Sequence, residues 1–403
     1  MKTVLTNCNL INCLSPTVIP NASIVIDDKR ISYAGNSPGP SAASSDLTID
    51  VNGAWVSPGL FDVHSHMVSP VNRPPNEDFL DGALRCGYES IAVLNVGVTT
   101  LRVVGTPGFV DIAWKKAFEA GAFVGPRIFA CGHIIQPTGG HGFSAGAAKK
   151  VESDGPEGFR RAVRNQINNG VDFIKMTITG GIMGPPWDNH NHTFILSDEL
   201  EAAFQVAHQR NYKIAVHAGG IDGVKAAIRA GAHSVEHGYV LDDEAIQLFV
   251  DYGTYWVPTL ALSHLTIDQA VTEHEKEYTN RWPLPDALKT RANLAAPIHE
   301  AGFKKALQAG VKIASGSDVG PPADGAILEL GLLARCGMTN MEAIQAATKT
   351  AAEVCCVSED LGTVEQGKLA DLVVLEKNPL EDLQYFRYPR MVFKEGALVV
   401  DNR

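Results

Sequence analysis

Asp62-Val63-His64-Ser65-His66 ends an apolar run that begins near Ala54. Side chains alternate between the two faces of a β-strand, so histidines one residue apart point to the same face. His64 and His66 could therefore bind one metal ion together. Taken alone the pair is weak evidence, because short motifs match by chance and two polar residues at a strand end also explain it.

Four further short apolar runs also carry a polar residue at or near the carboxyl end. They are Ile174-Lys175-Met176, Val216-His217-Ala218, Val235-Glu236-His237-Gly238 and Ser315-Gly316-Ser317-Asp318. Histidine and carboxylate are ordinary ligands of divalent first-row metals. The recurrence strengthens the metal interpretation of the first pair.

Residues 58–359 show a repeated change from a helical to a strand pattern. Each helical pattern ends in glycine, which takes the left-handed conformation that other residues resist, and a strand follows directly. These positions are Gly97, Gly121, Gly170, Gly231, Gly253 and Gly310, with Asn211 in the glycine's place before His217. Eight strand ends are expected near residues 64, 102, 131, 175, 217, 237, 260 and 316.

This pattern predicts an α/β protein built as a (β/α)8 TIM barrel, with its chemistry at the carboxyl ends of the strands. An open doubly wound sheet is the alternative, but no glycine-rich phosphate-binding motif follows the first strand. Strand patterns also open and close the chain. We expect residues 1–57 and 360–403 to form a small β-sandwich domain from both chain ends, with the barrel at residues 58–359.

Composition and charge limit the partners. The chain has 403 residues, 45% apolar and 20% charged, with a net charge of -11, which argues against nucleic acid or an anionic membrane as the main partner. Polar residues interrupt the first segment before a signal-peptide core could form. We expect a cytoplasmic protein that acts on a small-molecule substrate, and self-association into a homo-oligomer is left open. The seven cysteines show no C-x-x-C spacing, so no disulfide framework is expected.

Lys175 does not fit a ligand set in its ordinary form, because an ammonium group has no lone pair. Carboxylation by carbon dioxide would convert it into an anionic carbamate with two oxygens that can bridge two ions. The alternative is a charged side chain that reaches out of the strand to solvent.

Taken together, these residues resemble the binuclear members of the amidohydrolase superfamily. The segment Thr363–Leu375 is similar to the C-terminal β segment of that superfamily, so the resemblance covers nearly the whole chain. It implies two divalent ions, with zinc expected, and a carbon dioxide-derived carbamate on Lys175. The implied metal ligands are His64, His66, Lys175, His217, His237 and Asp318.

Further motifs resemble the branch of imidazolonepropionase-like proteins and metal-dependent, prolidase-like Xaa-Pro dipeptidases. They are Thr138-Gly139-Gly140-His141-Gly142, Thr179-Gly180-Gly181 and Glu236-His237-Gly238-Tyr239. The resemblance implies that His141 polarises the substrate carbonyl and that Tyr239 holds a substrate carboxylate. The alternatives are a loop histidine without a task and a tyrosine that packs the barrel rim.

The expected activity is hydrolysis of the C–N amide bond of a small substrate, of the Xaa-Pro dipeptide or N-acyl amino acid type. A hydroxide that bridges the metal ions would attack the carbonyl, and Asp318 would take its proton and pass it to the leaving amine. The alternatives are hydrolysis of an aryl amide or lactone of the secondary-metabolite or toxin type, and deamination of a ring, for which one ion suffices. A non-catalytic barrel scaffold would show a broken ligand set, and this set is intact.

Several loop residues could contact the substrate, but they do not identify it. The long segment 263–285 reads as a lid or substrate loop. The second His-X-His pair, His190 and His192, lacks an apolar strand before it and is not expected to bind metal. Arg73 and Arg281 lie in loops from which they could reach the mouth of the site and bind a carboxylate.

Overall fold

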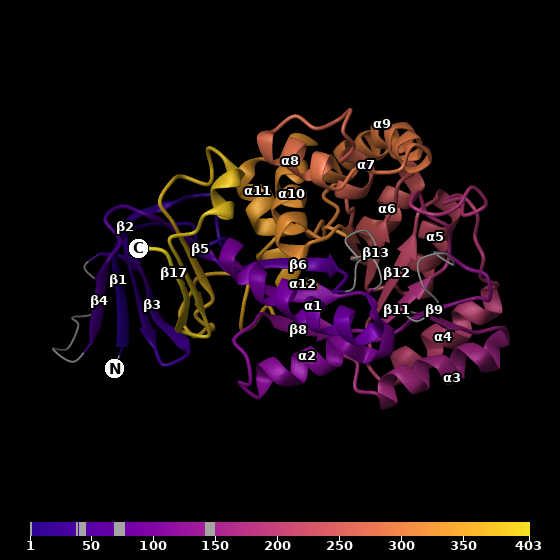
Figure 1. The fold of residues 1–403 in the computed structure, drawn as a ribbon, viewed down its shortest axis with the longest axis horizontal. Coiled ribbons are helices and arrows are strands. Elements are labelled where there is room, and N and C mark those ends of the chain that lie inside the picture. The colour runs from indigo at the N-terminus through magenta and orange to yellow at the C-terminus, as the bar shows by residue number, and fades with distance from the viewer. Residues whose placement is uncertain (1, 38, 40–45, 68–76, 142–149) are drawn as a thin grey trace.

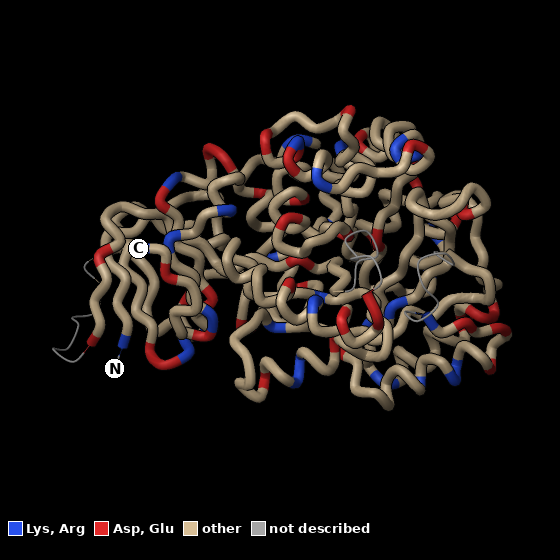
Figure 2. Tube along the Cα trace, in the orientation of Figure 1, with Lys and Arg blue, Asp and Glu red and all other residues tan. Residues whose placement is uncertain are grey.

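The computed structural model describes residues 2–37, 39, 46–67, 77–141 and 150–403. Figure 1 shows two parts along the long axis: a part made of strands, which holds both ends of the chain, and a larger part of strands surrounded by helices. Basic and acidic residues are interspersed over both parts in Figure 2. Within the described ranges, no helix combines the length and the apolar character that a bilayer crossing requires.

The strands of the two chain ends pair in one mixed sheet. Its order is β17-β16-β15-β5-β1-β2-β3, and β4 pairs with β1. The strands are β1 Lys2–Leu10, β2 Ile19–Asp27, β3 Arg30–Asn36, β4 Leu47–Asp50, β5 Trp55–Pro58, β15 Leu372–Leu375, β16 Met391–Lys394 and β17 Ala397–Asp401. The junction between the ends is antiparallel, with Leu372 opposite Pro58.

This sheet encloses one apolar core rather than forming two separate sheets of a sandwich. Leu5 and Ile24 of the first strands share a buried cluster with Leu372 and Phe393 of the last strands. The far edge also turns back, since the Ile31 amide donates to the Lys368 carbonyl at 2.8 Å. The predicted pairing of the two chain ends is therefore present in a single curled sheet.

Seven of the eight strands expected in the larger part are present. They are β6 Leu60–Ser65, β7 Val98–Val103, β8 Arg127–Ala130, β11 Ile174–Thr177, β12 Ile214–Ala218, β13 Ser234–His237 and β14 Tyr255–Val257. Two short strands that the sequence did not indicate, β9 (Ile134–Gln136) and β10 (Lys150–Glu152), follow β8. Among the described residues the strands form a three-stranded sheet, β6-β7-β8, and a six-stranded sheet, β10-β9-β11-β12-β13-β14, and not one closed ring.

Hydrogen bonds cross both gaps between these sheets. At the first gap the Asp172 amide donates to the Ala130 carbonyl at 2.7 Å. At the second gap the segment expected as the eighth strand is only a bridge between Ile313 and Trp256. This segment still contacts both neighbours, because the Ala314 amide donates to Trp256 at 2.9 Å and the Val63 amide donates to Ser315 at 3.0 Å.

The helices follow the strands in sequence and cover them in Figure 1. They are α1 Phe79–Ala92, α2 Val110–Glu119, α3 Gly155–Asn168, α4 Ser197–Gln209, α5 Ile221–Ala230, α6 Asp243–Tyr252, α7 Ala261–His264, α8 Glu273–Arg281, α9 Asp286–Gln308, α10 Pro322–Arg335, α11 Asn340–Ala346 and α12 Lys349–Val354. The expected helix caps are confirmed. The backbone φ angle is positive at Gly97, Gly121, Gly170, Gly231, Gly253, Gly310 and Asn211.

The helical pattern of the sequence from Asn340 to about Val357 predicts one helix, but the structure has two. The carbonyl of Ala346 accepts from the Ser315 amide at 3.0 Å, and the carbonyl of Ala347 accepts from the Phe61 amide at 2.7 Å. These carbonyls accept hydrogen bonds from Ser315 and from β6 instead of from the next helical turn. The helix α11 therefore ends there, and α12 starts after Thr348.

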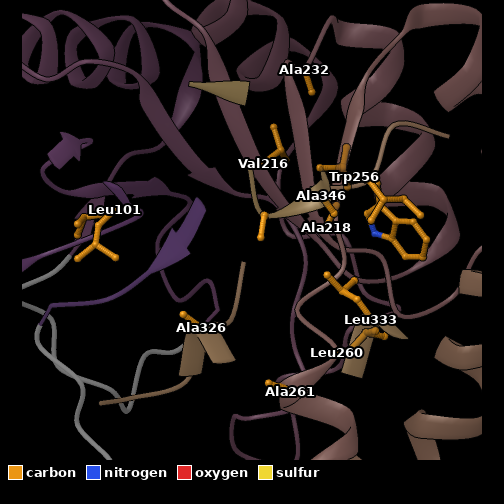
Figure 3. Close-up of a cluster of buried hydrophobic side chains, with 14 of the residues drawn as sticks. Leu101, Val216, Ala218, Ala232, Trp256, Leu260, Ala261, Ala326, Leu333 and Ala346 are labelled. Carbon is orange, nitrogen blue, oxygen red and sulfur yellow. The ribbon is translucent and has the colours of Figure 1, made fainter. Parts of the chain in front are cut away.

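A large apolar core fills the space between strands and helices. Figure 3 shows the side chains of Trp256, Leu260 and Leu333 close together in this cluster. Trp256 is fully buried and its indole Nε1 donates to the His237 carbonyl at 2.9 Å. Packing therefore fixes the strand end that carries His237.

Gly316 tests the close approach of the eighth segment to β6. A Cβ atom at this position would lie 2.6 Å from the His64 Cβ and 2.7 Å from the His64 amide nitrogen. We expect Gly316→Ala to lower the free energy of unfolding by about 1–3 kcal/mol, measured by urea denaturation, because backbone must shift to make room.

Gly158→Ala in α3 is the matched control, since the nearest atom to its added Cβ is 3.7 Å away. It should leave stability unchanged or raise it by up to about 1 kcal/mol. Equal effects of the two changes would contradict this account of the contact.

Candidate active site

The six residues expected to bind metal line one cavity of about 230 Å3, together with His141. His64 lies on β6, Lys175 on β11, His217 on β12 and His237 at the end of β13. His66 follows β6, and Asp318 follows the irregular eighth segment. The strand order therefore brings together side chains that are as much as 254 residues apart in the chain, from His64 to Asp318.

Short distances connect the donor atoms. Asp318 Oδ1 lies 3.2 Å from His66 Nε2, and Asp318 Oδ2 lies 3.6 Å from His64 Nε2. Ligand atoms of His64, His237 and Asp318 all lie within 4.8 Å of one another. The ring of His217 is 4.3 Å from that of His237, centroid to centroid.

Each of the four histidines has one ring nitrogen engaged by a protein oxygen. The contacts are His64 Nδ1 to Glu236 Oε2 at 2.6 Å, His66 Nδ1 to the Gly105 carbonyl at 3.0 Å, His217 Nε2 to the Gly180 carbonyl at 2.9 Å and His237 Nδ1 to Thr259 Oγ1 at 2.7 Å. Such contacts fix the ring and leave the second nitrogen available, which is the usual arrangement around metal-binding histidines.

Glu236 is held by a buried arginine that the sequence reasoning missed. Arg102 Nη2 lies 2.8 and 2.9 Å from the two Glu236 oxygens, and both side chains are almost fully buried. Burial alone would raise the pKa of Glu236, but the charges of Arg102 and Lys175 and the His64 contact hold it well below its usual range. A charged residue inside the apolar strand Val98–Val103 was the available signal for Arg102.

Lys175 is only 2% exposed, and its Nζ has no hydrogen-bond partner among the described residues. Burial lowers the pKa of Lys175, although the charges of Glu236 and Asp318 act in the opposite direction. Burial therefore acts in favour of the neutral amine, and the solvent-facing alternative for Lys175 is not what the structure has.

The protonation states of the neighbours suit cation binding. Burial lowers the pKa of His64 to about 4 and lowers the pKa values of His217 and His237 well below the usual value, so all three are neutral near pH 7. Burial would raise the pKa of Asp318, but His64 and His66 bring it down to about 2. The site thus offers neutral imidazoles and an anionic carboxylate.

Two of these residues lie in an uncommon backbone conformation. The φ angle is 73° at His237 and 54° at Asp318, in the left-handed region that non-glycine residues rarely adopt. Such conformations are frequent at functional sites, where the surrounding structure compensates for their cost.

His141 is oriented by Asp188, a second residue whose role the sequence reasoning did not identify. Its Nδ1 lies 2.8 Å from Oδ2 of the fully buried Asp188, and its ring stacks on His217 at 4.2 Å. The backbone around Asp188 is fastened by Arg291, which donates to the carbonyls of Gly181, Gly184, Pro185 and Asp188.

The comparison with protein-family models matches residues 55–399 to the description "Amidohydrolase family". The chain belongs to the amidohydrolase family. The Aspergillus niger ochratoxinase is 31% identical, with 94% of this chain and 82% of that protein covered. The imidazolonepropionase of Rhizobium meliloti is 26% identical, with 91% of this chain and 88% of that protein covered.

A solved structure supports the expected branch. The crystal structure of a Xaa-Pro dipeptidase with methionine bound in its active site is 33% identical, with 99% of each chain covered and a TM-score of 0.87. The resemblance to the imidazolonepropionase-like and prolidase-like branch, drawn from short motifs, is confirmed at the level of family and fold.

In this amidohydrolase, Tyr239 lies beside the cavity rather than in its lining. Its ring stacks on His237 at 5.4 Å and faces a neighbouring cavity of about 390 Å3, which His190 and Arg291 also line. His192 is exposed and, like His190, is absent from the lining of the main cavity. Arg281 contacts the ring of its neighbour Trp282, and Arg73 lies outside the described residues.

The segment 263–285 does contribute to the cavity, as expected for a substrate loop. Leu265, Tyr278, Trp282 and Leu284 form part of its wall. Further apolar side chains of the wall are Ile134, Met183, Ala261, Leu262, Leu288 and Val319. The amidohydrolase cavity therefore combines a polar floor at the strand ends with an apolar upper wall.

Replacing Arg102 tests whether the buried pair holds the site together. Arg102→Met leaves the Glu236 carboxylate buried without its cation, so we expect a loss of about 3–5 kcal/mol in the free energy of unfolding, measured by urea denaturation. The double variant Arg102→Met/Glu236→Gln should recover part of that loss, because the uncompensated charge is gone.

The control is Arg229→Met, which removes an exposed pair with Glu244 and should change stability by no more than about 1 kcal/mol. An Arg102 variant that is no less stable than this control would show that the buried pair is not needed.

Proposed function

We propose that this amidohydrolase is a metal-dependent enzyme that cleaves the amide C–N bond of a small substrate with a large apolar group. The observation that carries the proposal is the polar floor of the cavity, where five imidazoles, one carboxylate and a buried lysine amine face one space. The residues that would hold two divalent ions, with zinc as the expected metal, are His64, His66, Lys175, His217, His237 and Asp318.

The donor set fits that assignment. Three of the imidazoles are neutral near pH 7 and Asp318 is anionic, which are the forms that coordinate a cation. Lys175 fits once its neutral amine adds to carbon dioxide: the new N–C bond forms, one N–H proton leaves to solvent, and an anionic carbamate results. This carbamate would supply oxygens where the free amine now has no partner.

Divalent ions at such a site lower the pKa of water and polarise a carbonyl group. The chain itself supplies the proton transfers. Asp318 accepts the proton of the attacking water and delivers it to the leaving nitrogen, which an amide requires. With Nδ1–H donated to the Asp188 carboxylate, His141 can also donate from Nε2 to the carbonyl oxygen of the substrate when the ring is in its imidazolium form, which carries a hydrogen on both nitrogens.

The apolar wall supports a bulky acyl or aryl group more than a small dipeptide. Each buried methylene of a ligand contributes about 0.8 kcal/mol to the free energy of binding, so a wall built from leucines and aromatic rings binds larger apolar groups more tightly. Lys150 also lines the cavity and could contact a substrate carboxylate. The aromatic and leucine side chains of the wall favour an aryl amide as second candidate, and a carboxylate contact by Tyr239 stays a prediction.

We also propose how the chain divides. Residues 58–359 would form the (β/α)8 barrel. Its two sheets would be joined by the hydrogen bond to Ala130 and by the bridge at Ile313, in place of regular strand pairing. Residues 1–57 and 360–403 would form the β domain.

Metal removal tests the cofactor. A chelator should abolish hydrolysis and zinc should restore it, because the proposed chemistry needs the ions. Elemental analysis of the parent and of His64→Ala/His217→Ala should differ by about two ions per chain. Full activity in protein that holds no metal would refute the proposal.

Asp318→Asn tests the proton transfer. We expect kcat to fall by about three orders of magnitude or more, because the amide neither accepts nor delivers the proton. The control Asp268→Asn, at an exposed position outside the cavity, should keep kcat. A kcat of Asp318→Asn that stays within a few-fold of the parent value would mean that another group is the base.

Leu265→Ala tests the apolar wall. For an aryl-acyl amino acid we expect kcat/KM to fall about tenfold, while the value for a small dipeptide such as Ala-Pro changes little. Leu84→Ala, at an exposed leucine on α1, should affect neither substrate. Equal losses for both substrates, or no loss, would remove the argument for a bulky substrate.

A further inference from the structure

A second group of metal-binding residue types lies behind the apolar wall, outside the cavity lining. α7 supplies Ala261 and Leu262 to that wall and ends at His264. One ligand atom each of His264, Glu300 and Cys336 lie within 4.8 Å of one another. These residues come from three elements: α7, α9 and the C-terminal cap of α10.

His264 has a nitrogen without a partner. The side chain is only 6% exposed, and its Nδ1 contacts Ser263 Oγ at 2.9 Å and the Leu260 carbonyl at 3.2 Å. Its Nε2 is buried and has no hydrogen-bond partner among the described residues. Buried polar atoms are nearly always paired, so this nitrogen is available to bind a ligand.

Cys336 adds a soft donor. It is 1% exposed and forms no disulfide. Thiolate, imidazole and carboxylate together are a donor set that Zn²⁺ and similar ions bind well.

We propose that His264, Glu300 and Cys336 bind a thiophilic divalent ion such as Zn²⁺, separate from the ions of the catalytic cavity. On binding, a metal–sulfur bond forms and the Cys336 thiol proton leaves to solvent, so no oxidant or reductant is needed. Ligand distances of about 2.0–2.3 Å require the three donors to draw together by about an ångström. Solvent would complete a tetrahedral set.

Neighbouring cations make this site weaker than the catalytic one. Lys304 Nζ lies 2.6 Å from Glu300 Oε1, and Arg335 donates to the His264 carbonyl at 3.3 Å. Arg335 is also paired with Glu275 at 2.7 Å, which partly neutralises it. Lys304 is half-exposed, so water can replace its contact when Glu300 turns to the ion.

The ion would fasten α7 to α9 and α10. Because α7 carries part of the cavity wall, the site would stabilise the surface that contacts the apolar part of the substrate. Its existence does not depend on the proposed hydrolysis, and the two can fail separately.

Cobalt spectroscopy tests the proposal. Metal-depleted full-length protein is titrated with Co²⁺ and the near-ultraviolet charge-transfer band of a cobalt–thiolate bond is recorded. We expect the band in the parent, its loss in Cys336→Ser, and one bound ion fewer per chain in that variant. A parent without the band, or a band that persists in Cys336→Ser, would overturn the proposal.

Two cysteine controls separate this site from others. Cys356→Ser changes the exposed cysteine, and Cys131→Ser changes the thiol that interacts electrostatically with Lys175. Both should keep the band, and loss of the band in Cys131→Ser would place the thiolate beside Lys175 and refute the proposal. Hydrolysis by Cys336→Ser is measured in parallel, and an inactive parent that keeps the band would count against the proposed function alone.

Glu300→Gln provides a variant at a more exposed position, in case Cys336→Ser does not fold. It keeps the thiol but weakens the set, so we expect the band to appear at about tenfold or higher Co²⁺ concentration, since loss of even an outer partner has such an effect. An unchanged titration would exclude Glu300 and with it the proposed three-residue site.

Discussion

Burying the amine of Lys175 is costly, because the water that would solvate it is excluded and no oxygen of the described residues takes the place of that water. The surrounding residues make this arrangement tolerable in two ways. Burial favours the neutral amine. The nearby carboxylates of Glu236 and Asp318 act in the opposite direction, because they stabilise the ammonium form. A group bound between the imidazoles and this lysine would remove the cost altogether.

Buried polar groups outside the cavity are also held by specific partners. Glu236 can remain anionic in the interior because Arg102 binds both of its oxygens, and it then fixes the His64 ring. Thr259 fixes the His237 ring in a similar way. The turn that carries Thr259 is held in turn by Glu329, whose oxygens accept from the amides of Leu260 and Ala261 at 2.9 and 2.8 Å. The donor geometry thus depends on buried polar contacts several residues away from the cavity.

Much of the site could be predicted from sequence because its signals are local. A polar residue at the end of an apolar run marks a strand end, and glycine or Asn211 marks the helix end before it. These patterns predicted six residues that the structure places in one cavity. The partners that orient them were missed, because Arg102 and Glu236 are 134 residues apart and nothing local indicates that they pair.

The expectations that failed concern tertiary contacts. The eighth segment lacks a regular ladder since it must approach His64 closely at Gly316, and the last helix breaks where its carbonyls bind β6 and Ser315. The carboxylate contact of Tyr239 is not among these and stays a prediction: the residue follows the strand end as expected, and its ring lies near His190 and lines the neighbouring cavity. A linear motif specifies the position of a residue along the strand but not the direction that packing gives its side chain.

Carbon-13 NMR of metal-loaded enzyme prepared with 13C-bicarbonate tests most directly whether Lys175 carries a carbamate. The account predicts one carbamate carbon signal in the parent and its absence in Lys175→Ala. Active, metal-loaded parent enzyme that shows no such signal would contradict it.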